Sequence, residues 1–270
     1  MHSVAQVAAI WKINLGDGRS PALFLAGIMK NIPPDQYKHM KEELFQYMEQ
    51  SKIVFDELQV LSAVYTEVEQ RFTGIDDLAH GWEHVGRVYT LALSIAGREQ
   101  GNRFIVGMAA LLHDLGRTAS RNETGHHADL SVTLATDLMQ SHRVPQAQQE
   151  AILHAIIAHS FSRGVEPHTQ EARIVRDADR LDGLGAIGIL RWAVTGAVRR
   201  TPETCSYDPQ DPFGQRHTLD DQHYMLDHFY SKLLKLEATM LTETGRALAQ
   251  QRTAFMRSYL AEFKRELELL

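Results

Sequence analysis

Residues 106–116 of this 270-residue chain read VGMAALLHDLG, and this stretch decides the fold class. Every position from Val106 to Leu112 is small or apolar, which is typical of a helix buried on most of its sides. The pair His113-Asp114 follows directly, and a carboxylate there is costly unless it is paired, hydrogen-bonded or bound to a metal. We therefore expect either a metal site at this helix end, or a turn capped by Asp114 beside a core histidine.

The rest of the chain predicts an all-α fold, because apolar residues recur at helical spacing and no alternation of period two suggests a sheet. The expected helices cover residues 53–72, 82–99, 103–114, 126–142, 145–159, 171–179, 183–197 and 242–267. Residues 1–52 are expected to form an N-terminal extension with one helix that opens at Pro33-Pro34. Residues 53–270 are expected to form one domain.

Two features of the C-terminal third are informative. Three prolines mark residues 199–221 as a long loop, which is either a lid that brings Tyr207 or Arg216 to a substrate or an exposed excursion. After it, apolar residues recur at helical spacing from Met225 to Met240. We interpret that stripe as core packing.

Polar residues on other predicted helices can join the His113-Asp114 pair. His84 lies upstream, and the downstream segment 174–182, IVRDADRLD, offers Asp177, Asp179 and Asp182. Two imidazoles and two carboxylates can hold one divalent cation and leave positions open for water and substrate, as catalytic sites do. Spacing alone does not choose among the three downstream carboxylates.

This order of residues resembles the HD superfamily of metal-dependent phosphohydrolases, and more narrowly its stand-alone bacterial hydrolases of the YedJ/YpgQ type. The matching phrases run from about residue 55 to the C-terminus. They are Ala79-His80…His84…Arg87-Val88, Ala110-Leu-Leu-His-Asp114, His159-Ser-Phe-Ser162, Asp177-Ala-Asp-Arg-Leu-Asp182, Leu184-Gly-Ala-Ile-Gly188 and His228-Phe-Tyr-Ser-Lys-Leu-Leu234. The resemblance implies a single HD-domain helical bundle with an appended N-terminal arm and C-terminal helices. It also implies four metal ligands, namely His84, His113, Asp114 and Asp179.

The implied chemistry is attack of a metal-activated water on a small phosphorylated molecule. The expected catalytic residues are Asp114, His127, His159 and Asp182. His127 and His159 would bind phosphate or a second metal, and Asp182 would orient the water or hold Arg180. Phosphoryl transfer needs positive charge around the substrate. The expected substrate-binding residues are therefore His80, Arg117, Arg180, Arg191 and Lys232. The alternative for each arginine and for the lysine is an ordinary ion pair at the surface. The alternative for His80 is a polar residue at the start of a helix.

Mixed imidazole and carboxylate ligands favour Mn²⁺, with Mg²⁺, Ni²⁺, Co²⁺, Fe²⁺ and Zn²⁺ as alternatives. A nucleotide is the expected substrate, with release of pyrophosphate from a nucleoside triphosphate as the leading version. Hydrolysis of a nucleoside monophosphate or of a cyclic nucleotide is the alternative within the same chemistry. A di-iron oxygenase of the same fold and a metal-stabilised interaction module without turnover are the rivals from other classes.

The composition of the chain limits which partners and which cellular compartment we expect. A net charge of -6 and a pI of about 6.2 leave no basic surface of the kind that duplex nucleic acid requires. The apolar runs are shorter than the ~20 residues that span a bilayer, so no membrane partner is expected. The N-terminus does not read as a signal peptide, and the single cysteine, Cys205, fits a reducing compartment, so we expect a cytoplasmic protein. The N-terminal arm and the long last helix are compatible with a homodimer.

Overall fold

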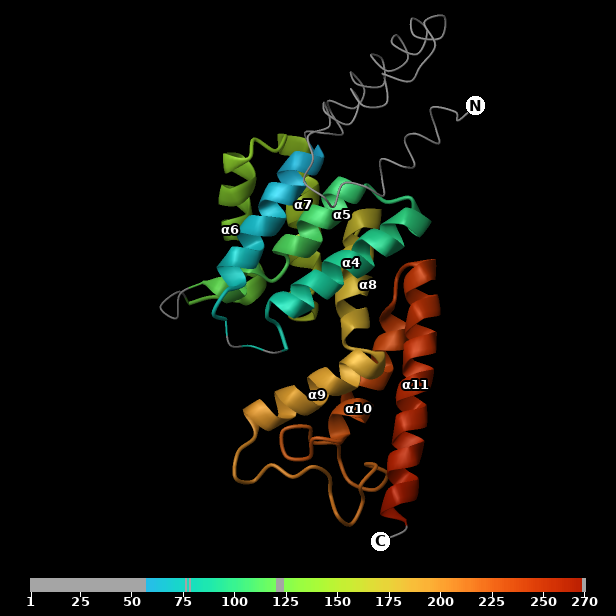
Figure 1. Cartoon of the computed structure of the whole chain (residues 1–270). Coiled ribbons are helices and arrows are strands. Elements are labelled where there is room, and N and C mark those ends of the chain that lie inside the picture. Colours follow the sequence, from blue (N-terminus) through green and yellow to red (C-terminus); the bar gives the residue numbers. More distant parts are fainter. Residues whose placement is uncertain (1–56, 76, 78, 120–123, 269–270) are drawn as a thin grey trace, which may run out of the picture. The chain divides into compact units, whose positions relative to one another are not determined.

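The computed structural model describes residues 57–75, 77, 79–119 and 124–268. Residues Glu57–Leu270 form one compact unit (Figure 1), and the described part of it is helical, without a β-strand. The expected all-α class is confirmed for this part of the chain. The expected extension, residues 1–52 with its helix after Pro33-Pro34, lies outside the described residues.

The helices follow the expected order. After a helix over residues 57–72, the elements are α4 (Trp82–Glu99), α5 (Arg103–Leu112), η1 (Leu115–Thr118, a 3₁₀ turn), α6 (His127–Ser141), α7 (Gln146–His159), η2 (Phe161–Arg163, also 3₁₀), α8 (Gln170–Asp182), α9 (Gly185–Arg199), α10 (Asp227–Ser231), η3 (Leu233–Thr239, 3₁₀) and α11 (Glu243–Leu267). Side chains of Asn102, Thr169 and Thr242 accept backbone N–H groups at the starts of α5, α8 and α11. Such caps satisfy donors that the first helical turn leaves free.

The end of α5 differs from the expected one, because the α-helix stops at Leu112 rather than at Asp114. The backbone then tightens into η1, which lies directly against α6. Gly116 makes this approach feasible, since a Cβ there would lie 2.2 Å from the carbonyl oxygen of His127. The Gly116 N–H donates to the Ser131 hydroxyl on α6 at 2.8 Å, which holds the turn in place. His113 and Asp114 thus stand at a fixed break between two elements.

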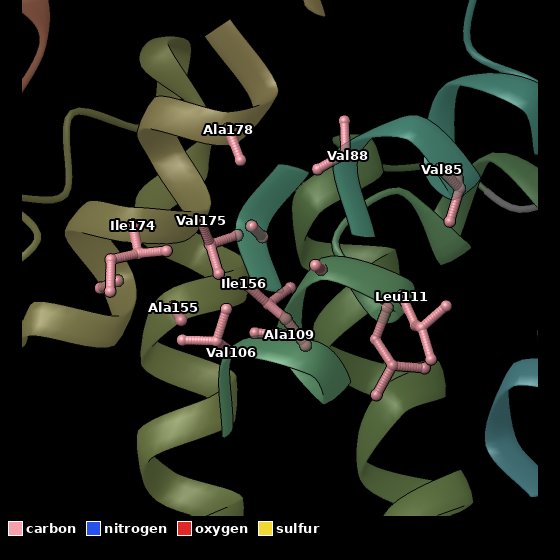
Figure 2. Packing of buried hydrophobic residues seen from close by; sticks show 14 of the residues in the cluster. Val85, Val88, Val106, Ala109, Leu111, Ala155, Ile156, Ile174, Val175 and Ala178 are labelled. Atoms are coloured by element: carbon pink, nitrogen blue, oxygen red, sulfur yellow. The ribbon is translucent and has the colours of Figure 1, made fainter. Parts of the chain in front are cut away.

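The core lies among α4, α5, α7 and α8, which pack against one another. In Figure 2, Val85 and Val88 of α4, Leu111 of α5, Ile156 of α7 and Val175 of α8 point into one apolar cluster. The whole run from Val106 to Leu112 is buried, as its composition predicts. A closely packed apolar core therefore adjoins the pair His113-Asp114 that follows α5.

α8 joins this core to the C-terminal helices, because it also packs against α9 and α11. The apolar stripe predicted between Met225 and Met240 is core packing, with Leu226, Phe229, Leu233 and Met240 buried. It does not follow one helix. Short α10 ends at a break at Lys232 (φ -136°, ψ -63°), and the tighter η3 follows.

The segment between α9 and α10 contains the loop expected at 199–221, and a carboxylate–imidazole network holds it. Asp211 accepts the backbone N–H groups of Gln215 and His217 and the Nδ1–H of His217, while His217 Nε2 lies 2.9 Å from Asp227 on α10. Tyr207 packs edge-on against Phe263 of α11.

The length and hydropathy of the described helices bear on whether any of them could span a membrane. No single one of them is long and apolar enough to cross a bilayer, and only α8 and α9 taken together, bent by 65° at their junction, meet the criteria of length and composition.

Candidate metal centre

Three helices bring polar side chains to one point at the edge of the core. α4 contributes His84, the break after α5 contributes His113 and Asp114, and α8 contributes Asp179. The Nε2 atoms of His84 and His113 are 3.2 Å apart, and Asp179 Oδ1 lies 3.4 Å from the first and 3.9 Å from the second. Asp114 Oδ2 lies 3.8 and 3.9 Å from the same two nitrogens. The structure therefore brings the four predicted metal ligands together.

Hydrogen bonds determine which nitrogen of each histidine faces this point. His113 Nδ1 donates to the Ala110 carbonyl oxygen at 2.8 Å, and His84 Nδ1 lies 2.7 Å from the carboxylate of Asp182. Because both acceptors lack a proton, both Nδ1 atoms carry one. The two Nε2 atoms are then free to direct lone pairs toward each other across 3.2 Å. Such an approach requires a proton or a cation between them, so this pair of histidines fits a metal site.

The charges of three of the four side chains match that requirement. Burial alone would raise the pKa of Asp114, but the nearby His113 and Arg117 outweigh it and hold the pKa below its usual range. The pKa of Asp179 is also held well below its usual range, because the hydrogen bond with His84 outweighs burial. Burial lowers the pKa of His113 to about 4. Neutral imidazole and ionised carboxylate are the protonation states that bind metals.

His84 lies between two carboxylates that favour its protonated form. Burial by itself would lower its pKa, but hydrogen bonds with Asp179 and Asp182 outweigh burial, and the pKa is raised. Asp179 faces the Nε2 of His84 and Asp182 faces its Nδ1, so the two carboxylates together favour the positively charged imidazole. A divalent ion would supply that charge and leave the imidazole neutral.

The second oxygen of Asp114 faces a second group of donors. Asp114 Oδ1 is buried and has no hydrogen-bond partner among the described residues, and it lies 3.6 Å from His127 Nε2 and 3.9 Å from His159 Nε2. His159 Nδ1 donates to the Ile156 carbonyl oxygen, which leaves its Nε2 lone pair for this side. Burial lowers the pKa of His127 to about 4. Asp114, His127 and His159 lie close enough together to hold a cation of their own, with Asp114 shared between the two groups.

The rotation of α8 separates the three carboxylates that spacing alone leaves equivalent. Successive helical residues turn by ~100°, so Asp177 and Asp179 point about 160° apart, whereas Asp182 is only about 60° from Asp179. Asp177 is buried on the far side, where it accepts the backbone N–H groups of Leu241 and Thr242 and the Thr242 hydroxyl. It therefore anchors the start of α11 to α8, while Asp179 faces the metal ligands.

Asp182 lies behind His84 and in contact with two arginines. Besides its contact with His84, its carboxylate accepts two hydrogen bonds from Arg87, at 2.7 and 3.0 Å, and one from Arg191 at 2.8 Å. A carboxylate in this position orients the imidazole and increases its basicity. Asp182 is bonded to these two arginines rather than to Arg180. The sequence reasoning did not assign Arg87 a role, although its place one helical turn after His84 was an available signal.

The side chains expected to bind substrate differ in their surroundings. Arg117 Nε donates to Asp114 Oδ2 at 2.6 Å, so this guanidinium lies at the centre itself. Arg191 is paired with Asp182, behind the ligands. The ring of His80 is 5.9 Å from that of His84, and burial lowers the pKa of His80 to about 4.

Arg180 is largely buried, donates to the Thr239 carbonyl oxygen at 3.1 Å, and has an Nη2 without a hydrogen-bond partner among the described residues. Lys232 is exposed at the break between α10 and η3, and no hydrogen bond or ion pair joins its side chain to any residue that the structure describes. The geometry thus places the Arg117 guanidinium against a ligand, holds that of Arg180 against the backbone of η3, and gives Lys232 no contact with the ligands.

Comparisons with known proteins match this domain. A family model described as "HD domain" matches residues 81–184, a stretch that contains all four predicted ligands. The uncharacterized protein YpgQ of Bacillus subtilis is 32% identical over 216 residues, which is 78% of this chain and 95% of YpgQ. The crystal structure of Bacillus subtilis YpgQ in complex with ADP aligns with a TM-score of 0.61 at 30% identity, over 78% of this chain and 96% of that one. An HD-superfamily hydrolase from Bacillus thuringiensis aligns with a TM-score of 0.63 at 31% identity, over 79% of this chain and all (100%) of that one.

Proposed function

Since this chain belongs to the HD-domain family and is a metal-dependent phosphohydrolase, we propose that its substrate is a nucleoside triphosphate, from which it releases pyrophosphate. The observation that carries the proposal is the pair of imidazole nitrogens that face each other at 3.2 Å between two ionised carboxylates. This arrangement accommodates a cation and leaves coordination positions for water and a phosphate oxygen.

The proposed ligands of that cation are His84, His113, Asp114 and Asp179. We propose Mn²⁺, because the set mixes nitrogen and oxygen donors and so suits a first-row transition ion better than calcium. When bound, such an ion neutralises phosphoryl charge and lowers the pKa of a coordinated water from 15.7 toward about 7. His127 and His159, on the other oxygen of Asp114, would bind a second ion or the oxygens of the phosphate chain.

The remaining residues of the centre have supporting roles in the proposal. Arg117 is close enough to the ligand Asp114 to place positive charge beside a bound phosphoryl group. Asp182 positions His84 through its Nδ1–H and keeps the Nε2 lone pair directed at the metal. The reaction adds water at the α-phosphorus and breaks the bond from that phosphorus to the oxygen bridging to the β-phosphorus. The products are a nucleoside monophosphate and pyrophosphate.

The nucleotide part of the proposal draws on a relative. The solved complex of YpgQ with ADP shows that a protein of this fold binds a nucleoside diphosphate. ADP shares its adenosine and its α–β phosphoanhydride with ATP, so we extend that binding to this chain and to a triphosphate.

The test uses protein freed of metal by chelation and then supplied with Mn²⁺, Mg²⁺, Ni²⁺, Co²⁺, Fe²⁺ or Zn²⁺. Each form is assayed against nucleoside triphosphates, nucleoside monophosphates and cyclic nucleotides, with phosphate and pyrophosphate quantified separately. We expect Mn²⁺-dependent release of pyrophosphate that Asp114→Ala abolishes. Asp137→Ala, which removes an exposed carboxylate on α6, is the matched control and should keep full activity. Release of phosphate alone, or turnover without metal, would contradict the proposal.

A further inference from the structure

We propose that Phe161 and Arg180 form a stacking site for the nucleobase of the substrate, an inference that rests on the proposed nucleotide hydrolysis. Phe161 is 81% exposed, which makes it the most exposed of the large apolar side chains in the described part of the chain. An aromatic ring left this open to water is suited to cover the flat, apolar face of a ligand.

One face of the ring lies against a buried arginine, and the turn that carries the ring is tied to α6. The Arg180 guanidinium carbon lies 5.9 Å from the centroid of the Phe161 ring, within the range of a cation–π contact. Arg180 is itself buried and donates to the Thr239 carbonyl oxygen. The turn η2 that carries Phe161 is tied to the start of α6, because Ser162 Oγ lies 2.7 Å from His126 Nε2. A preorganised ring loses little conformational freedom when a base stacks on it.

Both residues of this site are close in sequence to residues of the metal centre. Phe161 follows His159 by two residues, so their Cα atoms are within about 7 Å of each other, at ~3.3–3.6 Å per residue. Arg180 follows Asp179 directly on α8. A phosphate chain bound at the cation therefore leaves its nucleoside within reach of the exposed ring. Among the exposed large apolar side chains of the described residues, the other aromatic one is Phe255, which lies on α11.

The chemistry of stacking predicts the kind of selectivity. Every base has a π-face, so an aromatic ring binds purines and pyrimidines without reading their hydrogen-bonding edges. The site should therefore favour nucleotides over polyphosphates that lack a base, while it discriminates weakly among the bases. Phe161 would act on binding of the nucleoside rather than on the bond that breaks.

The experiment compares ATP with inorganic tripolyphosphate, which carries the phosphate chain without a base, in the presence of Mn²⁺. For Phe161→Ala we expect KM for ATP to rise roughly 5- to 30-fold with kcat nearly unchanged, and kcat/KM for tripolyphosphate to stay at the wild-type value. Phe161→Trp should restore the KM for ATP. Phe255→Ala, which removes an exposed phenylalanine on α11, is the matched control and should behave as wild type.

A second readout does not depend on turnover, namely calorimetric binding of ADP and of pyrophosphate to the same variants. Weakened binding of ADP with unchanged binding of pyrophosphate supports the stacking site, even if triphosphate hydrolysis is not the reaction. Equal loss for both ligands, or no loss for either, would overturn the inference. A change of oligomeric state in Phe161→Ala, seen by sedimentation and without an effect on ADP, would show instead that the ring covers a second copy of the chain.

Discussion

Replacing Asp182 by asparagine should weaken metal binding although Asp182 is not one of the proposed ligands. Its carboxylate accepts hydrogen bonds from His84 Nδ1, from Arg87 and from Arg191. Asparagine keeps one acceptor oxygen, loses the charge, and directs an NH₂ group at N–H donors. The imidazole of His84 would lose the partner that fixes its tautomer and orientation.

Loss of such a partner typically reduces metal affinity 10- to 100-fold, or about 1.4–2.7 kcal/mol. We expect the upper half of that range, because four hydrogen bonds converge on this single carboxylate. The side chains of Arg87 and Arg191 are 31% and 16% exposed, so water compensates part of their lost pairing. The free energy of unfolding should fall by roughly 1–3 kcal/mol, less than for a fully buried pair.

The assay is calorimetric titration of chelator-treated protein with Mn²⁺, which yields the Kd of each variant. Asp177→Asn is the matched control, since Asp177 is a buried carboxylate on the same helix that binds the start of α11 instead. That variant should lower Tm while leaving the Kd for Mn²⁺ unchanged. An unchanged Kd in Asp182→Asn, or an equal loss of affinity in Asp177→Asn, would refute the assignment of Asp182 as the residue that positions His84.

Three further predictions concern stability. Chelation should lower Tm by about 5–11 °C relative to protein with Mn²⁺ at ~100 times Kd, which corresponds to ~2.7 kcal/mol; equal Tm values in scanning calorimetry would speak against a metal centre. In urea titrations, Gly116→Ala should lose about 1–3 kcal/mol, because its Cβ would lie 2.2 Å from the His127 carbonyl oxygen. The Cβ of Gly86→Ala meets nothing within 4 Å, so this variant should gain about 0.4–1 kcal/mol of stability in the same assay. Changes in stability of the same sign for the two variants would contradict the packing at η1. Hydrogen bonds to Asp227 and Asp211 raise the pKa of His217. The contribution of His217 to stability is therefore complete below its unfolded pKa of about 6.5, and it is lost as the pH rises through its folded pKa. Amide exchange of residues 205–226, corrected for intrinsic rates, should therefore show less protection at pH 9 than at pH 6, and His217→Gln should remove the difference.

The sequence by itself determined the elements that depend on local pattern. The apolar run from Val106 to Leu112 predicts a buried helix, and the limits of α4 agree with the expected 82–99 because the periodicity and its ends are local properties. The resemblance carried by the motif phrases led to the family, which the comparisons confirm. It also selected the four proposed ligands before their convergence could be seen. All of these inferences use residues that are close in sequence, or a motif order that is readable along it.

Only the tertiary structure decided how distant side chains are divided among roles. Asp177, Asp179 and Asp182 look alike in sequence, but the rotation of α8 turns the first toward α11 and the other two toward α4. The break at Lys232 was equally invisible, because an apolar stripe fits a continuous helix as well as α10 followed by η3. Periodicity says that a helix has a buried face. Which neighbour that face meets, and which polar groups then lie within hydrogen-bonding distance, depends on the packing of segments far apart in the chain.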